Sequence, residues 1–373
     1  MDLHSLPTPA ALLDEARLQH NIGHMQARIS GLGARLRPHV KTAKCLPVAQ
    51  LQRAAGAQGI TVSTLKEAEV FFEAGFDDIL YAVCIAPPKL AQAQALRERG
   101  CALTVVVDAL AAAQAVAATG HRFEVMIEID SDGHRAGVKP ESELLLQLGR
   151  ALHEGGATLK GVMTHAGASY ECRTPQALQA MAEQERSRCV RAAQRLRAAG
   201  LPCPEVSVGS TPTALSALHL DGVTEVRAGV YVFHDLVMHG VGVCRIDEIA
   251  LSVLCTVIGH QLEKGWVLVD AGWMAMSRDR GTHELPVDQG YGAVCDEQGQ
   301  LIDGLIMGSA NQEHGILCWR DGHLDPVLAE RFAIGARLRI LPNHACATAA
   351  QFPGYELIGS DGHTRHLPRF YGW

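Results

Sequence analysis

The sequence predicts an α/β protein, with an N-terminal (β/α)8 barrel of the TIM type followed by a C-terminal all-β domain. The barrel is predicted because short apolar strands alternate with Ala- and Leu-rich helices, and eight such strands can be counted. The second domain is predicted by a change near residue 245, after which β-rich runs are separated by Gly and Asp turns. We expect the barrel to span 14–245, and the β domain to combine 1–13 with 246–373.

The first residues predict an extended segment and then a helix. The apolar, Pro-containing stretch 6–13 is typical of extended backbone, which could pair with the β domain. The stretch 14–30 is typical of an amphipathic helix. Its apolar residues recur at helical spacing, at Leu18, Ile22, Met25 and Ile29.

The alternation of strands and helices then continues to the end of the predicted barrel. The expected strands are 34–40, 59–63, 78–83, 103–107, 123–129, 158–164, 205–208 and 224–227. Helices are expected between them, for example at 85–99, 109–119, 141–155 and 174–199. Such alternation implies a parallel sheet, and eight strands favour a closed barrel over an open sheet. In the β domain, 249–258 and 266–270 are the clearest strands.

Composition excludes several classes of partner. The 373 residues are 47% hydrophobic and 20% charged, as in a folded globular protein. A net charge of −7 and an aromatic content of 5% argue against nucleic acid binding. No apolar run is long enough to span a membrane, and the N-terminus has no signal-peptide pattern. The eleven cysteines lack paired spacing, so we expect free thiols in a reducing cytoplasm.

Reactive residue types collect where the barrel strands are expected to end, which is where such barrels carry their active sites. Lys41, with His39 beside it, follows the first strand, and a lysine there can form a Schiff base with a carbonyl cofactor. Gly133–Gly137 follows the fifth strand and Thr164–Tyr170 the sixth. The alternatives are a solvated lysine and a chance clustering of polar loop residues.

Two glycine-containing segments follow the seventh and eighth strands, Gly209-Ser210-Thr211 and Gly229-Val230-Tyr231. Loops at these positions often hold a phosphate, since glycine lets backbone N–H groups approach the anion and hydroxyls add donors. Each segment alone is weak evidence. Together with Lys41 they indicate a cofactor that has both an aldehyde and a phosphate, which describes pyridoxal 5′-phosphate.

The β domain contains a second candidate site, His344-Ala345-Cys346. On a strand, residues two apart project to the same face, so we expect both side chains to point the same way. Imidazole and thiolate favour zinc or a similar divalent metal, and two protein ligands leave positions open for water and substrate. The alternative is a buried cysteine beside a hydrogen-bonded histidine.

Taken in order, these motifs resemble the fold-type III pyridoxal-phosphate family with alanine racemase-like barrels, and within it the metal-dependent D-serine dehydratase and D-threonine aldolase branch. The motifs span nearly the whole chain: Arg37–Thr42, Gly133–Gly137, Thr164–Gly167, Gly209–Thr213, Arg227–Tyr231 and Asn343–Cys346. The resemblance implies a homodimer with sites at the subunit interface.

The resemblance also implies roles for individual residues. Lys41 would be the Schiff-base lysine, and Arg135 would touch the pyridine ring or its O3′. The ring would be flanked by His165 and Tyr170. The phosphate would be held by Gly209, Ser210, Thr211, Gly229 and Tyr231. The metal (zinc, or manganese, cobalt or magnesium) would be bound by His344 and Cys346, and looser candidates for substrate contact are Gln312 and Tyr291.

The implied reaction is dehydration of a D-3-hydroxy amino acid to a 2-oxo acid and ammonia. The best candidate substrates are D-threo-3-hydroxyaspartate, giving oxaloacetate, and D-serine, giving pyruvate. The second carboxylate of the former would need a cationic partner, and Arg278 or Arg280 is a candidate. The metal would assist departure of the β-hydroxyl, and Lys41 would remove the Cα proton.

The main alternative is aldolase-type cleavage to glycine and an aldehyde, with His39 or a metal-bound water as the base. Cys346 favours the dehydratases, because the aldolases of this branch tend to carry Asp at the second metal position. Two further alternatives carry less weight. A racemase would need a second base and no metal, and a non-catalytic cofactor carrier would need no β domain.

Overall fold

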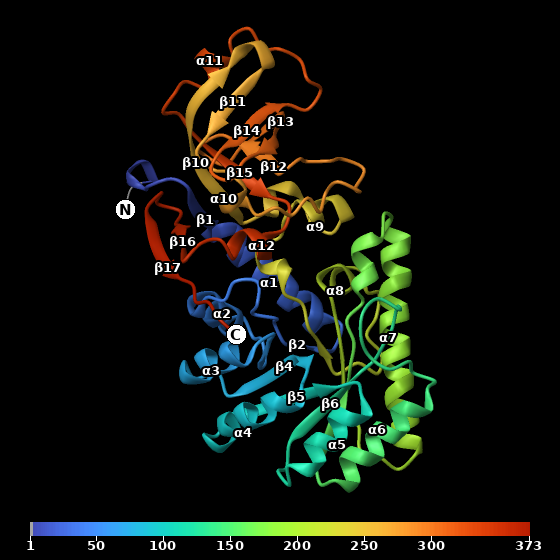
Figure 1. Ribbon diagram of the computed structural model, residues 1–373. Coiled ribbons are helices and arrows are strands. Elements are labelled where there is room, and N and C mark those ends of the chain that lie inside the picture. The colour runs from blue at the N-terminus through green and yellow to red at the C-terminus, as the bar shows by residue number, and fades with distance from the viewer. Residues whose placement is uncertain (1–2) are drawn as a thin grey trace. The chain divides into compact units, whose positions relative to one another are not determined.

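The computed structural model describes residues 3–373, which form two compact units (Figure 1). One unit combines the N-terminal residues up to Ile22 with Val230–Phe370. The other combines Gly23–Gly229 with Tyr371–Trp373. We call them the β unit and the barrel unit. Helix α1 (Glu15–Gly31) contributes residues to both.

The barrel unit contains eight parallel strands that hydrogen-bond in the order β2-β9-β8-β7-β6-β5-β4-β3. They are β2 (Arg35–Leu36), β3 (Ile60–Val62), β4 (Asp78–Cys84), β5 (Ala102–Val107), β6 (Glu124–Glu128), β7 (Thr158–Met163), β8 (Glu205–Val208) and β9 (Glu225–Val226). A bridge between His39 and Thr61 joins the ends of this order, with Val40 N–H donating to the Thr61 carbonyl at 3.0 Å. The predicted (β/α)8 barrel is therefore confirmed, strand by strand.

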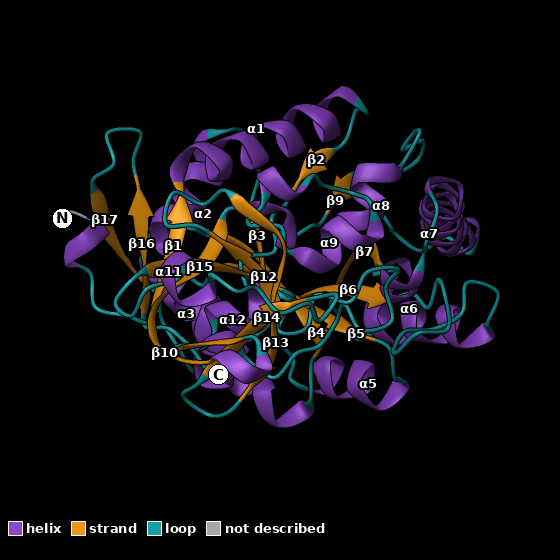
Figure 2. Ribbon diagram, turned by 90° about the horizontal axis from the view of Figure 1, so that it is seen from above, coloured by secondary structure: helices purple, strands orange, loops and turns teal. Residues whose placement is uncertain are grey.

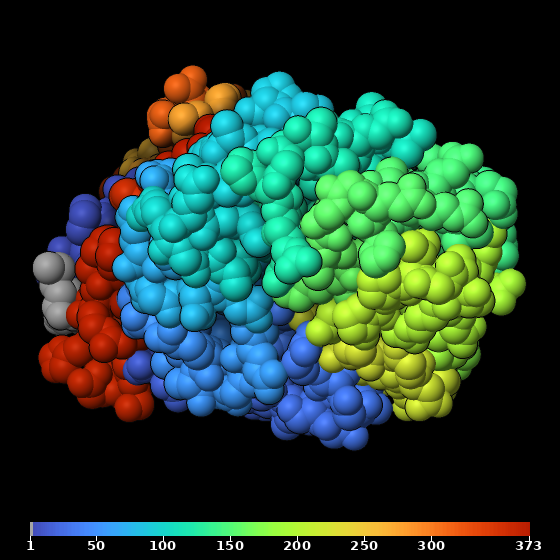
Figure 3. All heavy atoms as spheres, turned by 90° about the horizontal axis from the view of Figure 1, so that it is seen from below, coloured from blue at the N-terminus to red at the C-terminus, as the bar shows by residue number. Residues whose placement is uncertain are grey.

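Helices lie outside the strands of the barrel unit, as Figure 2 shows for α5, α6 and α7 beside β5, β6 and β7. Their bounds are α2 (Leu46–Ala54), α3 (Leu65–Glu73), α4 (Leu90–Glu98), α5 (Leu110–Ala118), α6 (Glu143–Glu154), α7 (Pro175–Ala198) and α8 (Thr211–Ser216). Several begin at a side-chain N-cap: Thr64 accepts from the Glu67 N–H, and Thr174 accepts from Ala177. Figure 3 shows these segments following one another in chain order, from blue to yellow-green.

The interior of the barrel changes in character along its length. At the amino-terminal end of the strands, Arg37 is buried and bonds Glu225 at 2.6 Å and both oxygens of Asp78. Above this charged layer lies an apolar one, formed by Leu80, Val106, Met126 and Met163. The polar residues at the carboxyl end of the strands are left for the site described below.

The β unit is built on a closed ring of six strands, in the order β10-β11-β14-β13-β12-β15. Strand β1 pairs with β10 and β16, and β17 completes the sheet. The bounds are β1 (Ala10–Asp14), β10 (Leu251–Gln261), β11 (Trp266–Val269), β12 (Gly292–Cys295), β13 (Leu301–Ala310), β14 (Gly315–Trp319), β15 (Arg337–Pro342), β16 (Gly354–Ile358) and β17 (Thr364–Pro368). Apart from the parallel β1–β16 pair, neighbouring strands are antiparallel, as predicted for an all-β domain.

Short helices interrupt the β unit. They are α9 (Leu236–Val241), α10 (Trp273–Met276), α11 (Leu328–Arg331) and α12 (Ala345–Ala349). These helices have four to six residues, which is too short for a periodic pattern in the sequence to reveal them. Within residues 3–373, no helix has both the length and the apolar character needed to cross a membrane.

Candidate active site

Two lysines follow the first barrel strand, and their surroundings distinguish them. Lys44 Nζ lies 3.1 Å from Oε1 of Glu67, a carboxylate with 0% exposure, so this lysine is held in a structural ion pair. Lys41 is exposed, in the turn after the His39 bridge, and its side chain makes no ion pair or hydrogen bond to any described residue. Lys41 is thus the lysine that is free to react with a carbonyl group.

His39 lies at the end of the same strand, where its backbone N–H donates to the Ala228 carbonyl at 2.8 Å. Its buried Nδ1 has no hydrogen-bond partner in the described part of the chain. Burial, together with the charges of Lys41 and Arg227, lowers the pKa of His39 well below its usual value. The imidazole is therefore neutral and keeps an unsatisfied ring nitrogen beside Lys41, as a proton acceptor would.

His165 follows β7, and its Nδ1 lies 3.0 Å from the Gly209 carbonyl oxygen. Since a carbonyl only accepts, Nδ1 carries the proton. Burial, with smaller contributions from Lys41 and Arg135, lowers the pKa of His165 to about 3. A neutral, fixed imidazole is suited to lie against an aromatic ring. The Tyr170 ring centre is 6.4 Å from that of His165, so the two predicted ring-flanking residues are close together.

Arg135 lies in the exposed loop after β6, and its guanidinium makes no hydrogen bond or ion pair with any residue in 3–373. The same loop is anchored at both ends. Gly137 N–H donates to Asp108 at 3.1 Å, and Asp132 accepts from the Ala168 N–H at 2.9 Å. A free guanidinium on an anchored loop is available to a ligand.

The segment Gly209–Thr213 joins β8 to α8. Ser210 caps α8, with a reciprocal capping box in which Thr213 N–H donates to Ser210 Oγ at 3.2 Å. Gly209 has φ 140°, and a Cβ there would lie 2.1 Å from the Arg227 carbonyl oxygen. Gly229 is also confined, since a Cβ would lie 3.0 Å from the His39 carbonyl oxygen. Both glycines permit the close backbone approach that a phosphate loop requires.

Sequence reasoning did not assign a role to Arg227, which was read only as part of a motif. Its guanidinium is 4% exposed, in the barrel interior, and donates to Ser207 Oγ and the Thr164 carbonyl. It contributes to the low pKa values of both His39 and His165. The signal that could have revealed it was an arginine inside an otherwise apolar strand end.

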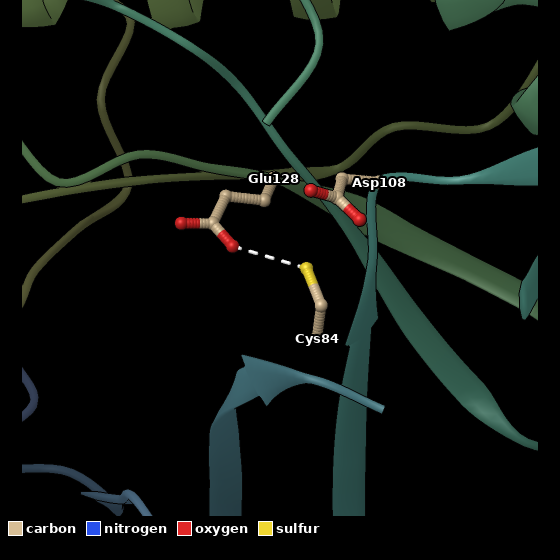
Figure 4. A group of neighbouring side chains, drawn as sticks. All are labelled: Cys84, Asp108 and Glu128. Atoms are coloured by element: carbon tan, nitrogen blue, oxygen red, sulfur yellow. Dashed lines mark hydrogen bonds between the residues drawn. The ribbon is translucent and has the colours of Figure 1, made fainter. Parts of the chain in front are cut away.

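Three further polar side chains meet at the ends of β4, β5 and β6 (Figure 4). The ligand atoms of Cys84, Asp108 and Glu128 lie within 4.8 Å of one another. Cys84 Sγ donates to Glu128 Oε2 at 3.1 Å. Burial and the two carboxylates raise the pKa of the thiol, so it stays protonated and donates its one proton to Glu128. The sequence analysis did not connect these residues, because each follows a different strand.

In the β unit, the prediction that His344 and Cys346 lie on a strand is wrong. Strand β15 ends at Pro342, His344 is the N-cap of α12, and Cys346 lies in its first turn. The buried Asp235 carboxylate caps this helix instead, since it accepts from the Ala345 N–H at 2.8 Å. His344 and Cys346 are nevertheless hydrogen-bonded to each other, so the two predicted metal ligands do converge.

A third residue, Asp279, completes this group. Its Oδ2 lies 2.6 Å from His344 Nδ1, and its backbone carbonyl accepts from the Asn343 side chain at 3.2 Å. The other ring nitrogen of His344 and the Cys346 sulfur would then form a mixed N,S donor pair. Such a pair fits a borderline-soft divalent metal and leaves coordination positions open. No sequence pattern assigned a role to Asp279, which lies between Arg278 and Arg280.

The other β-unit candidates differ in their exposure and in whether their side chains already form an ion pair. Arg278 is exposed and packs over the Trp273 ring at 5.2 Å, without an ion pair to any described residue. Arg280 instead bonds Asp288 at 2.9 Å and packs over the Tyr291 ring at 5.1 Å. Gln312 is exposed and Tyr231 is buried, with 1% of its surface accessible. Arg278 is therefore the arginine that is free to bind a carboxylate.

Comparison with known proteins agrees with this geometry. A family model described as "Alanine racemase, N-terminal domain" matches residues 13–236, which is more than half of the chain. The chain belongs to this family. A second model, "Putative serine dehydratase domain", matches residues 250–358 in the β unit.

Within the family, the chain is 63% identical to D-threo-3-hydroxyaspartate dehydratase of Delftia sp. (strain HT23), over 100% of this chain and 99% of that protein. It is 31% identical to D-serine dehydratase of Dictyostelium discoideum, over 96% and 95% of the two chains. D-threonine aldolase of Filomicrobium marinum is more distant, with 26% identity and a TM-score of 0.81 over 99% and 96%.

The solved structure of the Delftia enzyme has a TM-score of 0.99 to this chain, at 62% identity and full coverage of both chains. A cysteine-to-alanine variant of a D-threo-3-hydroxyaspartate dehydratase, 62% identical to this chain with a TM-score of 0.99, has also been solved in a metal-free form. The family, the fold and the match to dehydratases along the whole chain are thus shown.

Proposed function

We propose that this protein is a pyridoxal-phosphate- and divalent-metal-dependent dehydratase that removes water from D-3-hydroxy amino acids. D-threo-3-hydroxyaspartate is the favoured substrate, yielding oxaloacetate and ammonia, and D-serine is the second candidate, yielding pyruvate. The observation that carries the proposal is the 63% identity to a D-threo-3-hydroxyaspartate dehydratase along the whole chain. The free Lys41 and the His344–Cys346 pair support it independently.

The barrel residues fit pyridoxal phosphate. When bound, this cofactor supplies an electron sink that acidifies the substrate Cα–H. Lys41 has the unpaired amine needed to hold the aldehyde and later to accept the Cα proton. His165 and Tyr170 would flank the ring, Arg135 would contact its oxygen, and the segments at Gly209–Thr211, Gly229 and Tyr231 would bind the phosphate.

The β-unit residues fit a divalent metal. His344 and Cys346 offer one nitrogen and one sulfur, for which zinc is the best match, with manganese, cobalt or magnesium as alternatives. The chemistry that such a metal supplies is Lewis-acid assistance to the departing β-hydroxyl, a poor leaving group on its own. A cysteine-to-alanine variant of a D-threo-3-hydroxyaspartate dehydratase that is 62% identical to this chain is described as metal-free, which supports the proposal that such dehydratases bind a metal.

Arg278 would distinguish between the candidate substrates by binding the second carboxylate that only 3-hydroxyaspartate has. Its guanidinium is exposed and lacks an acidic partner among the described residues, so it is available for the second carboxylate of 3-hydroxyaspartate. Tyr291 and Gln312 are further proposed contacts. D-serine has no second carboxylate and would not use Arg278.

Two statements about the whole protein are also proposals. We propose a homodimer with sites at the subunit interface, which the family resemblance supports and which the mass in solution would test. We propose a cytoplasmic location, supported by eleven cysteines that are all free thiols.

The deciding experiment is product analysis on the purified protein with D-threo-3-hydroxyaspartate, D-serine and D-threonine, each with and without EDTA. We expect ammonia and a 2-oxo acid, with the activity lost on chelation and restored by added metal. Glycine and an aldehyde would instead make the protein an aldolase and show that Cys346 is a misleading discriminator. Activity that is insensitive to EDTA would contradict the metal role.

A further inference from the structure

Glu185 is a buried carboxylate that joins two loops at the barrel rim. It lies on α7 with 2% of its surface exposed. Its Oε1 accepts hydrogen bonds from the backbone N–H groups of Ala166, at 2.9 Å, and of Gly209, at 3.1 Å. The Thr213 hydroxyl is a further partner. None of the steps described above uses this residue.

Burying a carboxyl group at this position costs free energy, because the group loses its contact with water. No Lys, Arg or His side chain in residues 3–373 forms an ion pair with Glu185, and burial raises its pKa. A carboxyl group in such a place is retained only if its hydrogen bonds are well made. The N–H groups of the two loops therefore hold Glu185, and Glu185 in turn fixes the loops.

These two loops carry residues assigned to opposite parts of the cofactor. Ala166 directly follows the ring-flanking His165, and Gly209 directly precedes the phosphate residue Ser210. His165 also donates to the Gly209 carbonyl at 3.0 Å. The Gly209 residue is thus held through its N–H by Glu185 and through its C=O by His165.

We propose that Glu185 is a positioning residue that sets the spacing between the ring-flanking loop and the phosphate loop, so that both engage one cofactor molecule. The inference deepens the proposed function and rests on it. The proposal has a specific consequence. Loss of Glu185 should reduce the extra binding affinity that the cofactor's phosphate group provides, and should affect the affinity for the pyridoxal ring much less.

The test measures dissociation constants of the cofactor-free protein for pyridoxal phosphate and for pyridoxal, which lacks the phosphate, by absorbance titration. We expect Glu185→Ala to weaken pyridoxal phosphate binding about tenfold or more, with pyridoxal binding nearly unchanged, so that the ratio of the pyridoxal constant to the pyridoxal phosphate constant falls. Glu185→Gln should keep the ratio within about threefold, because its amide oxygen can accept the same two hydrogen bonds.

Glu185→Asp is the second variant if the alanine variant does not fold. Its side chain is one methylene shorter and cannot reach both loops, so the ratio should fall here too. Glu183→Ala is the matched control, since Glu183 lies on the same helix and pairs with Arg186 at the surface. An unchanged ratio in folded Glu185→Ala or Glu185→Asp protein, or an equal loss of affinity for both ligands, would overturn the inference. If the unsubstituted protein binds neither ligand, the proposed function itself fails.

Discussion

Asp279 Oδ2 lies 2.6 Å from His344 Nδ1, and this contact determines which nitrogen of the imidazole can bind a metal. A carboxylate at Nδ1 keeps that nitrogen protonated and orients the ring, so Nε2 is the nitrogen that would face a metal. The Asp279 backbone is fixed as well, since its carbonyl accepts from Asn343 and its other carboxylate oxygen accepts from the Gly281 N–H at 2.8 Å. The loop around Asp279 would therefore support the proposed metal site without supplying a ligand.

The first prediction concerns the role of Asp279 in orienting the His344 ring. Asp279→Ala should weaken metal binding about 10- to 100-fold, because His344, the proposed ligand, loses its orienting partner. Calorimetric titration of the metal-stripped protein with zinc and manganese would measure this, without reference to activity. Asp288→Ala is the control, since Asp288 lies in the same loop but pairs with Arg280 instead. Equal affinities for the Asp279 variant and the unsubstituted protein would contradict the supporting role.

A second prediction tests which lysine holds the cofactor. Borohydride reduction of the protein loaded with pyridoxal phosphate should fix the cofactor on the peptide that contains Lys41, as peptide mass spectrometry would show. Lys41→Ala should abolish the covalent label and the elimination activity. Lys44→Ala should still be labelled, although it should be less stable because it leaves the buried Glu67 unpaired. Labelling of the Lys41→Ala protein at Lys44 would show that the assignment is wrong.

The repeated pattern of the barrel could be predicted from the sequence, because each strand is a short apolar run between helices, as in Leu103–Val107. The ends of these strands could also be found, and with them Lys41, His165 and Gly209. In each case the information is local, since it lies within a few residues of one strand.

Sequence patterns did not reveal those residues whose roles depend on contacts between distant segments of the chain. Glu185 looks like any acidic residue of a long helix, and only the fold places it between Ala166 and Gly209. Asp279 lies 65 positions before His344, with no spacing that connects them. The strand expected at His344–Cys346 failed for a related reason, since the Asp235 carboxylate that caps α12 is supplied from far away in the sequence.

A third prediction separates the two arginines of the 277–280 segment. Arg278→Ala should lower kcat/KM for D-threo-3-hydroxyaspartate about 10- to 100-fold, the worth of a charge-assisted hydrogen bond, and leave D-serine nearly unaffected. Arg280→Ala is the matched control and should affect the two substrates alike, because Arg280 is already engaged by Asp288. Steady-state kinetics with both substrates would decide. Equal losses for the two substrates in the Arg278 variant would exclude a role in reading the second carboxylate.

The last prediction concerns acid stability and rests on the pair between Arg37 Nε and Glu225 Oε2, which are 2.6 Å apart and buried. Burial alone would raise the pKa of Glu225, but Arg37 and the Ser207 hydroxyl hold it below its ordinary value. The folded state therefore binds this proton less readily than the unfolded state does. Ionised Glu225 stabilises the fold above its unfolded-state pKa, and this contribution is lost as the pH falls through the folded-state value.

Glu225→Gln should accordingly reduce the free energy of unfolding by about 3 kcal/mol at neutral pH, since it leaves a buried guanidinium short of its counter-charge. The difference from the unsubstituted protein should shrink as the pH falls through the lowered pKa of Glu225, because the carboxylate itself then becomes protonated. Urea unfolding over a series of pH values would measure both. Glu141→Gln, which removes an exposed partner of Arg191, should leave the free energy of unfolding nearly unchanged. A Glu225→Gln penalty that stays constant down to low pH would show that the ionised carboxylate is not its cause.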